Sequence, residues 1–388
     1  MPAVYQAAGR IIEIRKSPDQ DEIKLLRNQN IQTCVFAQMP ENAEFLQEGD
    51  LVAVVSQSEI ILLAPQLKSL PNRSFSPALL KKWNLYLGFI RDFFKEREFL
   101  EVRTPVLVPC PGTEPTLDVF STELQIGSRK RKLFLPTSPE LHLKKALALG
   151  ADKIFELANC FRNGEITQRH QPEFMMLEWY RAYSNLSEIK DDVVNLVSFL
   201  AHRFSLTAPR QVLSYSVADL FKKYCDFDLT PLTTAEELNA LAARLQVDVH
   251  SAESIDDLFF LIFMEKIESR LESQDLIFVE KYPPYQAALA RLTKDGWGDR
   301  FEVYWQGYEL ANAFHELNHP EIQRLRSIED LDKKTRMQKE EIGLDQEFFD
   351  CLDAGMPPSG GIALGVERLF MCLFGIADIR ELKIFPLK

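Results

Sequence analysis

The segment CFRNGEITQRHQPEFMMLEWYRAY at residues 160–183 constrains the fold more than any other part of the chain. An apolar run ends at Arg162, a polar stretch with turn-forming residues follows, and a second apolar run begins shortly before Glu178. Glu178 and Tyr180 are two residues apart, which places both side chains on one face of a strand. The pattern predicts two antiparallel strands joined by a loop rich in Arg, His and Glu.

This hairpin combines two kinds of chemistry. Arg162, Arg169 and His170 carry side chains suited to holding a phosphate. Glu178 stands within the apolar sequence MMLEWY, where its carboxylate is expected to be partly buried. A buried charge needs a partner. We therefore expect Glu178 and Tyr180 to face a cation.

The composition is that of a globular chain without a membrane span. Its 388 residues are 46% hydrophobic and 26% charged, a length for roughly two or three domains. No apolar run approaches the about 18 residues of a transmembrane helix, and the start MPAVYQAAGRII lacks the features of a signal peptide. The six cysteines form no CxxC pair, which predicts reduced thiols in a cytoplasmic protein. The net charge of -12 argues against strong nonspecific binding to nucleic acid.

The first 70 residues alternate short β-like runs with polar turns. The runs cover residues 9–15, 22–26, 32–37, 51–55 and 59–63. This spacing predicts a small all-β domain at residues 1–70, a barrel or sandwich of the OB type. Nine acidic residues against six Lys and Arg favour a packing or protein-contact role over RNA binding. A linker is expected at residues 71–77, followed by a larger domain at residues 78–388.

The larger domain is expected to begin with a helix and a strand. Apolar side chains at spacings of three and four predict a helix at residues 77–98. Residues 99–108 are expected to form a strand, and Pro105 places it at a sheet edge or a subunit contact. The sequence GSRKRK at residues 127–132 predicts a basic hairpin turn, either solvated or in contact with an acidic partner.

Further helices are indicated by capping signals and apolar spacing. In TSPELHLKK, Ser138 is the expected cap of a helix whose first turn holds Glu140. The helix dipole alone would explain an acid at this position. Amphipathic or charged helices without apparent chemistry are expected at residues 186–204, 216–224, 233–245, 254–274 and 320–343.

The C-terminal part adds further polar residues. Glu302, Glu309 and Glu316 are spaced seven residues apart, with Asn312 between the last two. Two carboxylates near phosphates can hold Mg²⁺ through oxygen ligands. The segment PPSGGIALGVER then predicts a glycine-rich turn, an apolar strand and a helix entered at Arg368, whose guanidinium can reach a phosphate.

Three separated segments together resemble one family. FLEVRTPVL, the FRNGE…RHQPEF hairpin and GIALGVERLF are similar, in this order, to motifs 1, 2 and 3 of class II aminoacyl-tRNA synthetases. TSPELHLKK, MMLEWY and YELANAFHEL resemble the lysine-pocket segments of lysyl-tRNA synthetases. The resemblance implies an α+β fold with an antiparallel sheet flanked by helices, preceded here by the small all-β domain. It also implies a homodimer formed through motif 1.

The resemblance implies an ATP site with Mg²⁺. Its residues would be Arg162, Asn163, Glu165, Arg169, His170, Phe174, Glu302, Glu309 and Arg368. Arg162 would hold the α-phosphate and the substrate carboxylate, and Arg162 and Arg368 are the implied catalytic residues. Phe174 would stack on adenine, while Glu302 and Glu309 would bind the metal. The outer phosphates would be contacted by Arg169 and His170.

The resemblance also implies a site for an amino acid with two amino groups. Its residues would be Ser138, Glu140, Glu178, Tyr180, Asn312, Glu316 and Ala363. Glu140 would recognise the α- or β-amino group, and Asn312 the carboxylate. Glu178, Tyr180 and Glu316 would receive the distal ammonium.

Departures from lysyl-tRNA synthetases are informative. Their motif 2 usually contains FRNEG, whereas Gly164 precedes Glu165 here; either Glu165 takes over a nucleotide contact or the contact is lost. Ala363 replaces a glycine and Ser138 an alanine, and both match the truncated paralogues that attach (R)-β-lysine to a lysine of elongation factor P. Typical members of that group begin close to the catalytic core, so residues 1–70 are a departure from them as well.

The sequence therefore predicts a cytoplasmic ligase that uses ATP and Mg²⁺. It would activate (R)-β-lysine, or lysine, as an aminoacyl-adenylate and transfer it to a lysine side chain of elongation factor P. The alternatives are a minimal lysyl-tRNA synthetase-like enzyme that charges tRNA and a noncatalytic paralogue that senses lysine. The near-complete set of ATP and lysine residues argues against the noncatalytic alternative. Neither tRNA nor a membrane is an expected partner.

Overall fold

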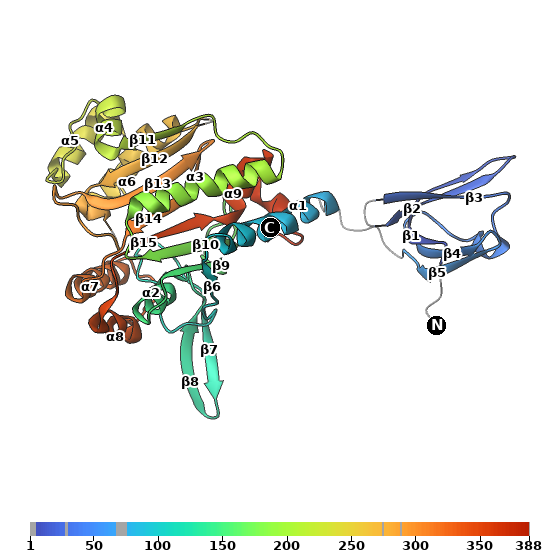
Figure 1. Cartoon of the computed structure of the whole chain (residues 1–388), viewed down its shortest axis with the longest axis horizontal. Helices are drawn as coiled ribbons and strands as arrows, with labels where there is room; N and C mark the ends of the chain where they lie inside the picture. Colours follow the sequence, from blue (N-terminus) through green and yellow to red (C-terminus); the bar gives the residue numbers. More distant parts are fainter. Residues whose placement is uncertain (1–4, 28–29, 67–75, 274, 288, 388) are drawn as a thin grey trace. The chain divides into compact units, whose positions relative to one another are not determined.

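The computed structural model describes residues 5–27, 30–66, 76–273, 275–287 and 289–387 (Figure 1). The chain divides into two compact units, Met1–Asn84 and Leu85–Lys388. The domain borders predicted from the sequence stay a prediction, and residues 71–75 of the expected linker lie outside the described residues.

The N-terminal unit is an antiparallel sheet, as the all-β prediction requires. Its strands are β1 (Ala7–Lys16), β2 (Asp21–Arg27), β3 (Asn30–Phe36), β4 (Leu51–Ser56) and β5 (Glu59–Ala64), in the order β3-β2-β1-β4-β5. A 3-10 turn, η1 (Glu41–Ala43), precedes β4. Ile11, Ile23, Leu25, Val52 and Ile60 are buried and form the core of this unit. The five strands expected from the alternation of apolar and polar residues are confirmed.

The larger unit is built on an eight-stranded sheet in the described part of the chain. In spatial order its strands are β11 (Val212–Ser216), β12 (Leu276–Tyr282), β13 (Gly298–Trp305), β14 (Tyr308–His315), β15 (Ser359–Gly365), β10 (Glu173–Ala182), β9 (Lys153–Phe161) and β6 (Leu100–Glu101). Neighbouring strands are antiparallel except for the outer pairs β11–β12 and β6–β9. The predicted α+β fold with an antiparallel sheet flanked by helices is confirmed.

One face of the sheet is covered by three helices that turn apolar side chains toward it. They are α1 (Pro77–Lys95), α3 (Leu186–Arg203) and α9 (Val366–Phe374) (Figure 1). Trp179 of β10 is fully buried on this side, and its Nε1 donates to Asp192 of α3 at 3.2 Å. The side chains of successive strand residues alternate between the faces. Glu178 and Tyr180 therefore project from the opposite face, as their spacing predicted.

Three helices form an insertion between β11 and β12. They are α4 (Val217–Cys225), α5 (Ala235–Leu245) and α6 (Ile255–Lys266), followed by the turn η2 (Glu268–Arg270). Their core includes Phe259, which stacks on Phe221 and on Phe263, and it continues to Ile277 and Val279 of β12. All three helices were expected, although the last ends at Lys266 rather than near residue 274.

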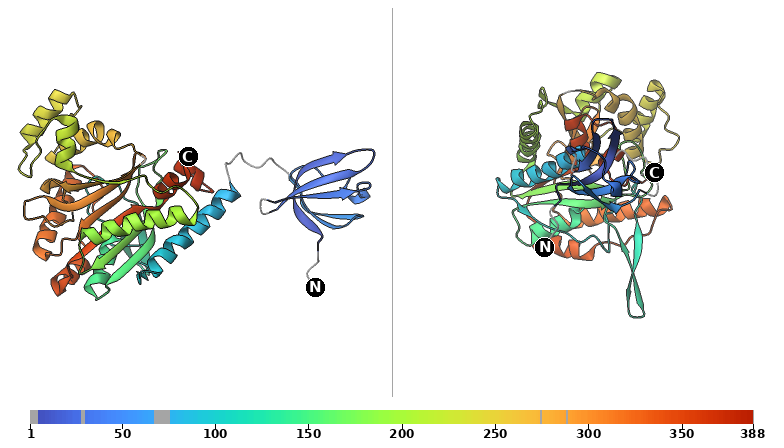
Figure 2. Two further views of the ribbon diagram at one scale, coloured as in Figure 1. Left: turned by 45° about the horizontal axis from the view of Figure 1, so that its top comes forward. Right: turned by 90° about the vertical axis from the view of Figure 1, so that its right-hand side faces the viewer.

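The remaining elements flank the face that bears Glu178 and Tyr180 or extend from it. They are α2 (Glu140–Ala148), α7 (Pro320–Arg336), α8 (Gln346–Gly355) and η3 (Pro284–Gln286), while η4 (Ile379–Leu382) follows α9 and packs against it. Strands β7 (Ser121–Ile126) and β8 (Arg129–Phe134) form a separate two-stranded arm that projects from the unit (Figures 1 and 2). Gly127 turns the arm with a positive φ of 61°, so the predicted basic hairpin turn is confirmed.

Two local expectations are wrong. Residues 99–108 form a strand only at Leu100–Glu101, because beyond Val102 the chain leaves the ladder and the Thr104 N–H donates to the Glu156 side chain; the strand does lie at the expected sheet edge. Pro139, rather than Ser138, is the N-cap of α2, and no side chain caps this helix. The Ser138 Oγ instead accepts a 3.4 Å hydrogen bond from the Glu140 backbone N–H.

Within the described residues, no helix is both long and apolar enough to span a membrane. The six cysteines are free thiols.

Candidate active site

Five neighbouring strands each contribute one residue to a row that crosses the sheet. Glu156 in β9 pairs with Glu178 in β10, and Glu178 pairs with Ala363 in β15. Ala363 pairs with Asn312 in β14, which in turn pairs with Glu302 in β13. Residues opposite each other in a ladder share a face. The register therefore brings four of the predicted site residues together from distant parts of the chain.

Glu178 and Tyr180 form the buried centre of this face. The Tyr180 hydroxyl donates to Glu178 Oε2 at 3.0 Å, and the two residues are 3% and 1% exposed. Burial, and then the nearby charge of Glu140, raises the pKa of Glu178 well above its usual range. Its other oxygen, Oε1, is buried without a hydrogen-bond donor. This carboxylate is therefore ready to accept a hydrogen bond from a bound group.

Glu140 and Glu316 extend the acidic face on the side of α2. A side chain not singled out from the sequence, Lys144, lies between them: its Nζ is 2.5 Å from Glu140 Oε1 and 2.6 Å from Glu316 Oε2. Burial raises the pKa of Glu316 to about 8, although the Lys144 ammonium opposes the shift. Oε1 of Glu316 is again buried without a hydrogen-bond donor.

Gly361 in β15 makes room for these acids. It pairs with Tyr180 in β10, two residues along from the Glu178–Ala363 pair. A Cβ at this position would overlap Glu316 Oε1 and the ring of Tyr180. The residue lies within a strand, not in the glycine-rich turn expected from the sequence. Its lack of a side chain serves the packing of the pocket.

Arg162 lies directly after β9, at the start of the loop that joins the hairpin. Its guanidinium lies 5.2 Å from the ring centroid of Phe174, at the start of β10. Its Nε is buried and has no hydrogen-bond acceptor. Phe174 projects from the same face as Glu178, because the two are four residues apart in one strand. A donor for an anion and a flat apolar ring are thus adjacent to the acid pocket.

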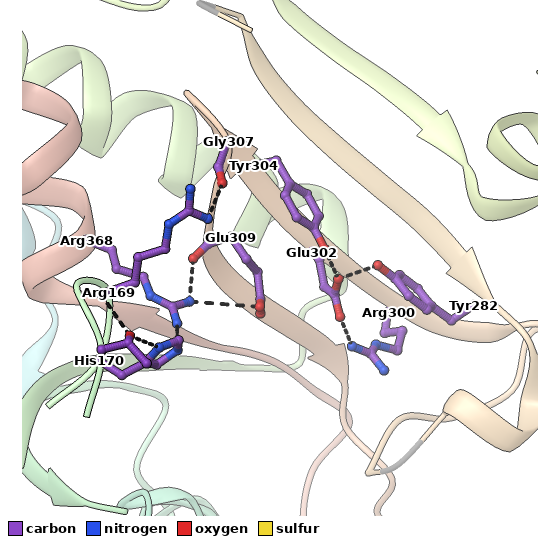
Figure 3. A network of polar contacts seen from close by, with 10 residues as sticks. Arg169, His170, Tyr282, Arg300, Glu302, Tyr304, Gly307, Glu309 and Arg368 are labelled. Atoms are coloured by element: carbon purple, nitrogen blue, oxygen red, sulfur yellow. Dashed lines mark hydrogen bonds and ion pairs between the residues drawn. The ribbon is translucent and has the colours of Figure 1, made fainter. Parts of the chain in front are cut away.

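Arg368, at the start of α9, contacts both Glu309 of β14 and His170 of the hairpin loop (Figure 3). It donates to the backbone oxygen of Glu309 at 2.8 Å and contacts His170 Nε2 at 2.6 Å. Burial, and then the Arg368 charge, lowers the pKa of His170. The partners indicate a neutral imidazole that accepts from Arg368 at Nε2, with its Nδ1 proton directed at Thr167 Oγ1, 3.0 Å away. Arg169 lies over the ring of Tyr308, 4.6 Å from its centroid.

Glu302 and Glu309, the predicted Mg²⁺ ligands, have different partners (Figure 3). Glu302 is bound on one oxygen by the hydroxyls of Tyr282 and Tyr304, at 2.5 and 2.7 Å, and on the other by Arg300. The carboxylate of Glu309 lies 3.9 Å from Arg368. Burial, and then the charge of Glu302, raises the pKa of Glu309 to about 7.

The tip of the loop is more exposed. Gly164 has a φ of 80° and open space where a Cβ would lie, so a left-handed turn explains the glycine here. Glu165 follows it and acts electrostatically on His170, opposing the lowering of the histidine pKa. Asn163 is exposed, and its backbone N–H donates to the backbone oxygen of Asp118. The structure therefore places Glu165 close enough to His170 to act on its charge.

The unpaired polar atoms indicate what the site can hold. Buried atoms without a hydrogen-bond partner include Arg162 Nε, Glu178 Oε1, Asn312 Oδ1 and Glu316 Oε1. One is a donor for an anion and three are acceptors for ammonium or amide N–H groups. An amino acid with a carboxylate and two ammonium groups fits this set.

Sequence comparison assigns the larger unit to a family. The family described as tRNA synthetases class II (D, K and N) matches residues 69–388. The chain belongs to this class II tRNA synthetase family. It is 36% identical over 316 residues to the elongation factor P–(R)-β-lysine ligase of Proteus mirabilis (strain HI4320), covering 79% of this chain and 94% of that protein. It is also 36% identical over 308 residues to the protein of the same name from Haemophilus influenzae (strain PittGG), covering 78% and 93%. The predicted relation to this ligase group is confirmed.

Sequence reasoning missed several residues of this class II synthetase site. Lys144 stands four residues after the predicted site residue Glu140 in ELHLK, a spacing that signals a helical ion pair but not its burial. Tyr304 is two residues from Glu302, so the spacing alone predicts that the two side chains lie on one face of a strand. Tyr282 and Arg300 had no comparable signal, because their contacts with Glu302 depend on tertiary placement.

Proposed function

We propose that this enzyme uses ATP to activate (R)-β-lysine as an aminoacyl-adenylate and transfers the aminoacyl group to a lysine side chain of elongation factor P. The observation that carries the proposal is the buried acceptor set of Glu178, Glu316 and Asn312 beside the unpaired donor of Arg162. The names of the relatives from Proteus mirabilis and Haemophilus influenzae support the donor and the acceptor.

The amino acid would lie across the row of paired residues. Its distal ammonium would bind Glu178 and Glu316, with Tyr180 holding the Glu178 carboxylate in place. Glu140 would receive the α- or β-amino group, and Asn312 would contact the carboxylate end. An ammonium in a buried site is stabilised only when such acceptors surround it, because desolvation is otherwise too costly.

ATP would bind along the adjoining basic loop. Arg162 would contact the α-phosphate and the substrate carboxylate, and Phe174 would stack on adenine. Arg169, His170 and Arg368 would contact the outer phosphates. Asn163 and Glu165 are proposed nucleotide contacts that require the loop to close on the ligand, since Asn163 is exposed.

Glu309 and Glu302 are the residues that would hold Mg²⁺, which supplies charge neutralisation at the phosphates when bound. Within the described residues, no three His, Cys, Asp or Glu side chains form a metal cluster. Such a pair of carboxylates suits an ion that takes its remaining ligands from phosphate oxygens and water. Glu302 is held by Arg300 and two tyrosines, so Glu309 is the more available of the two.

The activation step needs no protein nucleophile. A carboxylate oxygen of the amino acid attacks the α-phosphorus, the bond to the oxygen bridging to the β-phosphate breaks, and pyrophosphate leaves. Arg162 and Arg368 are the proposed catalytic residues, because both cations would lie against the charge that develops in this step. Holding the two reactants in line supplies the rest.

The transfer step uses the incoming lysine as nucleophile. Its neutral ε-amine attacks the carbonyl carbon of the adenylate, the C–O bond to phosphate breaks, AMP leaves, and the nitrogen loses a proton to solvent. We propose Ala363 and Ser138 as the residues that distinguish β-lysine from α-lysine. Ala363 lies in the row between Glu178 and Asn312, where one methyl group changes the space between the two ends of the substrate.

A homodimer and a cytoplasmic location are part of the same proposal. The acceptor is a translation factor, and the FLEVRTPVL segment resembles the dimer-forming motif of class II synthetases. Size-exclusion chromatography with light scattering tests the oligomeric state directly.

The reaction is tested with purified enzyme, ATP and either (R)-β-lysine or α-lysine. Pyrophosphate exchange reports activation, and intact mass of elongation factor P together with acid gels of tRNA reports the acceptor. We expect exchange with (R)-β-lysine and a mass increase of elongation factor P by one lysyl group. Charged tRNA with unmodified elongation factor P would contradict the proposal.

A further inference from the structure

Lys144 occupies an unusual place for a lysine. It is on α2, four residues after Glu140, and its side chain is completely buried. Its ammonium bridges two carboxylates from different elements, Glu140 on α2 and Glu316 just after β14. Ordinary i, i+4 pairs on exposed helices contribute little to stability, because water and salt screen both charges. A buried lysine held by two acids therefore has a different role from a surface helix pair.

The pocket around Lys144 has a definite charge balance. The three acids that face the amino-acid site are Glu140, Glu178 and Glu316, and Lys144 is the cation that bridges two of them. With all four groups ionised, three negative charges and one positive charge leave a net charge of -2. The two ammonium groups of a diamino acid together carry a charge of +2, while its carboxylate faces Arg162. The charges of these four groups and of the two ammonium groups then balance.

We propose that Lys144 is a positioning residue that sets the charge of the amino-acid pocket to match a substrate with two ammonium groups. It would act through Glu140 and Glu316, holding one oxygen of each carboxylate and leaving the others to the substrate. The inference rests on the proposed function, because it concerns how that site selects a diamino acid.

Loss of Lys144 should change how amino-acid binding depends on pH. Without Lys144 the acids of the pocket would have no cation among them, so at a given pH more of them would carry protons, and a protonated carboxyl does not pair with an ammonium. The groups that face the Lys144 ammonium and these acids are Glu140, Glu316, Glu178, the Tyr180 hydroxyl and, beyond Glu140, Glu114. Removal of the cation raises the proton affinity of the acids. Amino-acid binding should then require a higher pH.

The first experiment compares Lys144→Met with Lys145→Met by pyrophosphate exchange. Lys145 is the neighbouring lysine, but it binds Asp345 and Glu347 and ties α2 to α8. We expect Lys144→Met to raise the KM for the amino acid at least 10-fold while the KM for ATP changes less than 2-fold. The pH above which the amino-acid KM stops falling should rise by at least one unit. Lys145→Met should lower thermal stability without either change.

The second experiment uses the sign of the charge change. Glu140→Gln leaves two acids and Lys144, a net charge of -1, whereas Glu140→Gln/Lys144→Met leaves two acids and no lysine, a net charge of -2. We expect the double variant to bind the diamino acid several-fold more tightly than Glu140→Gln, measured by calorimetry. A merely structural lysine predicts weaker binding by the double variant. If Lys144→Met alone does not fold, the comparison of Glu140→Gln with the double variant still tests the role of Lys144.

The failure of this inference is distinguishable from that of the proposed function. A wild-type enzyme that activates neither lysine isomer overturns the proposed function, while calorimetry with lysine still tests Lys144. A wild-type enzyme that activates the amino acid, with Lys144→Met unchanged in amino-acid KM and pH profile, overturns the role of Lys144. A double variant that binds no better than Glu140→Gln does the same.

Discussion

Glu178 and Ala363 are direct partners across the β10–β15 ladder, and Ala363 separates Glu178 from Asn312 in the same row. The methyl group therefore lies between the residues proposed for the two ends of the substrate. Ala363→Gly should shift the ratio of kcat/KM values from (R)-β-lysine toward α-lysine. One methyl group in a pocket is worth about 1–3 kcal/mol, so we expect a change of at least 5-fold in pyrophosphate exchange.

The control for this variant is its stability. Glycine within a strand costs roughly 0.5–1 kcal/mol, so a small loss measured by denaturant unfolding is expected and should affect both isomers alike. An unchanged isomer ratio would remove Ala363 as a determinant of selectivity.

Glu178→Gln should separate amino-acid binding from ATP binding. The variant keeps the shape of the side chain but removes the charge that would pair with the distal ammonium. Hydrogen bonds to charged groups contribute about 1.5–3 kcal/mol, so the amino-acid kcat/KM should fall roughly 10- to 100-fold. ATP affinity, measured by equilibrium binding, should stay within 2-fold of the wild type.

Glu156→Gln is the matched control for Glu178→Gln. Glu156 is the direct partner of Glu178 in the same row, but its Oε1 accepts the backbone N–H of Thr104 at 2.9 Å. The control variant should lose stability rather than amino-acid affinity. Equal loss of amino-acid and ATP binding in Glu178→Gln would show that the pocket is assigned wrongly.

The affinity for the amino acid should depend on pH because of Glu316. Its pKa of about 8 leaves its carboxyl largely protonated in the free enzyme at pH 7. The pKa of Glu178 is also raised well above its usual range. A protonated carboxyl does not pair with an ammonium, so binding at pH 7 should release protons. The amino-acid KM should fall as pH rises from 6 to about 8 and level off above it.

Calorimetry in buffers of different ionisation enthalpy checks this proton release. Glu316→Gln should reduce the number of protons released at pH 7 and flatten the pH profile. Proton uptake on binding, or the same profile in Glu316→Gln, would contradict the assignment.

Much of this site was predictable because local spacing determines which face a residue takes. Glu178 and Tyr180 share a face because they are two residues apart in a strand, and motif resemblance placed Asn312 and Ala363 beside them. The expected strand at residues 99–108 is much shorter in the structure, because the Thr104 N–H donates to the side chain of Glu156 instead of a ladder carbonyl, a contact that sequence spacing does not reveal.

The partners of Glu302 were not predictable in the same way. Tyr282 reaches Glu302 from a neighbouring strand, in a ladder with an irregularity between Glu280 and Tyr282. Such an irregularity shifts the register, so the contact cannot be counted from sequence positions. Lys144 was hidden for another reason, since an i, i+4 pair has the same spacing whether the helix face is buried or exposed.

Glu302 and Glu309 should respond differently to the same substitution. Glu309→Gln should raise the Mg²⁺ concentration for half-maximal activation roughly 10-fold, because its carboxylate has only a distant contact with Arg368. Glu302→Gln should lower the free energy of unfolding by about 3 kcal/mol, since it leaves the buried Arg300 without its charge partner. Metal titration of exchange activity and denaturant unfolding measure the two effects.

The opposite pattern, a destabilised Glu309→Gln and a Glu302→Gln changed only in its metal requirement, would reverse the two assignments. Because the pKa of Glu309 is about 7, the Mg²⁺ requirement of the wild type should also fall as pH rises through 7. Below that pH the carboxyl is protonated and its proton competes with the metal.

Gly361→Ala should remove amino-acid binding through packing alone. The added Cβ would overlap Glu316 Oε1 and the ring of Tyr180, so one acceptor for the distal ammonium would be displaced together with the side chain that holds the other, Glu178. Gly360→Ala is the matched control on the other face, where the Cβ would lie 2.7 Å from Ile189 Cγ1 and 3.0 Å from the Asn185 oxygen, against α3. Both variants should lose stability in unfolding measurements, because each adds a methyl group to a site that is already filled. Only Gly361→Ala should lose lysine binding by calorimetry at a temperature where both remain folded, and equal lysine affinity in the two would show that the distal ammonium does not bind beside Tyr180 and Glu316.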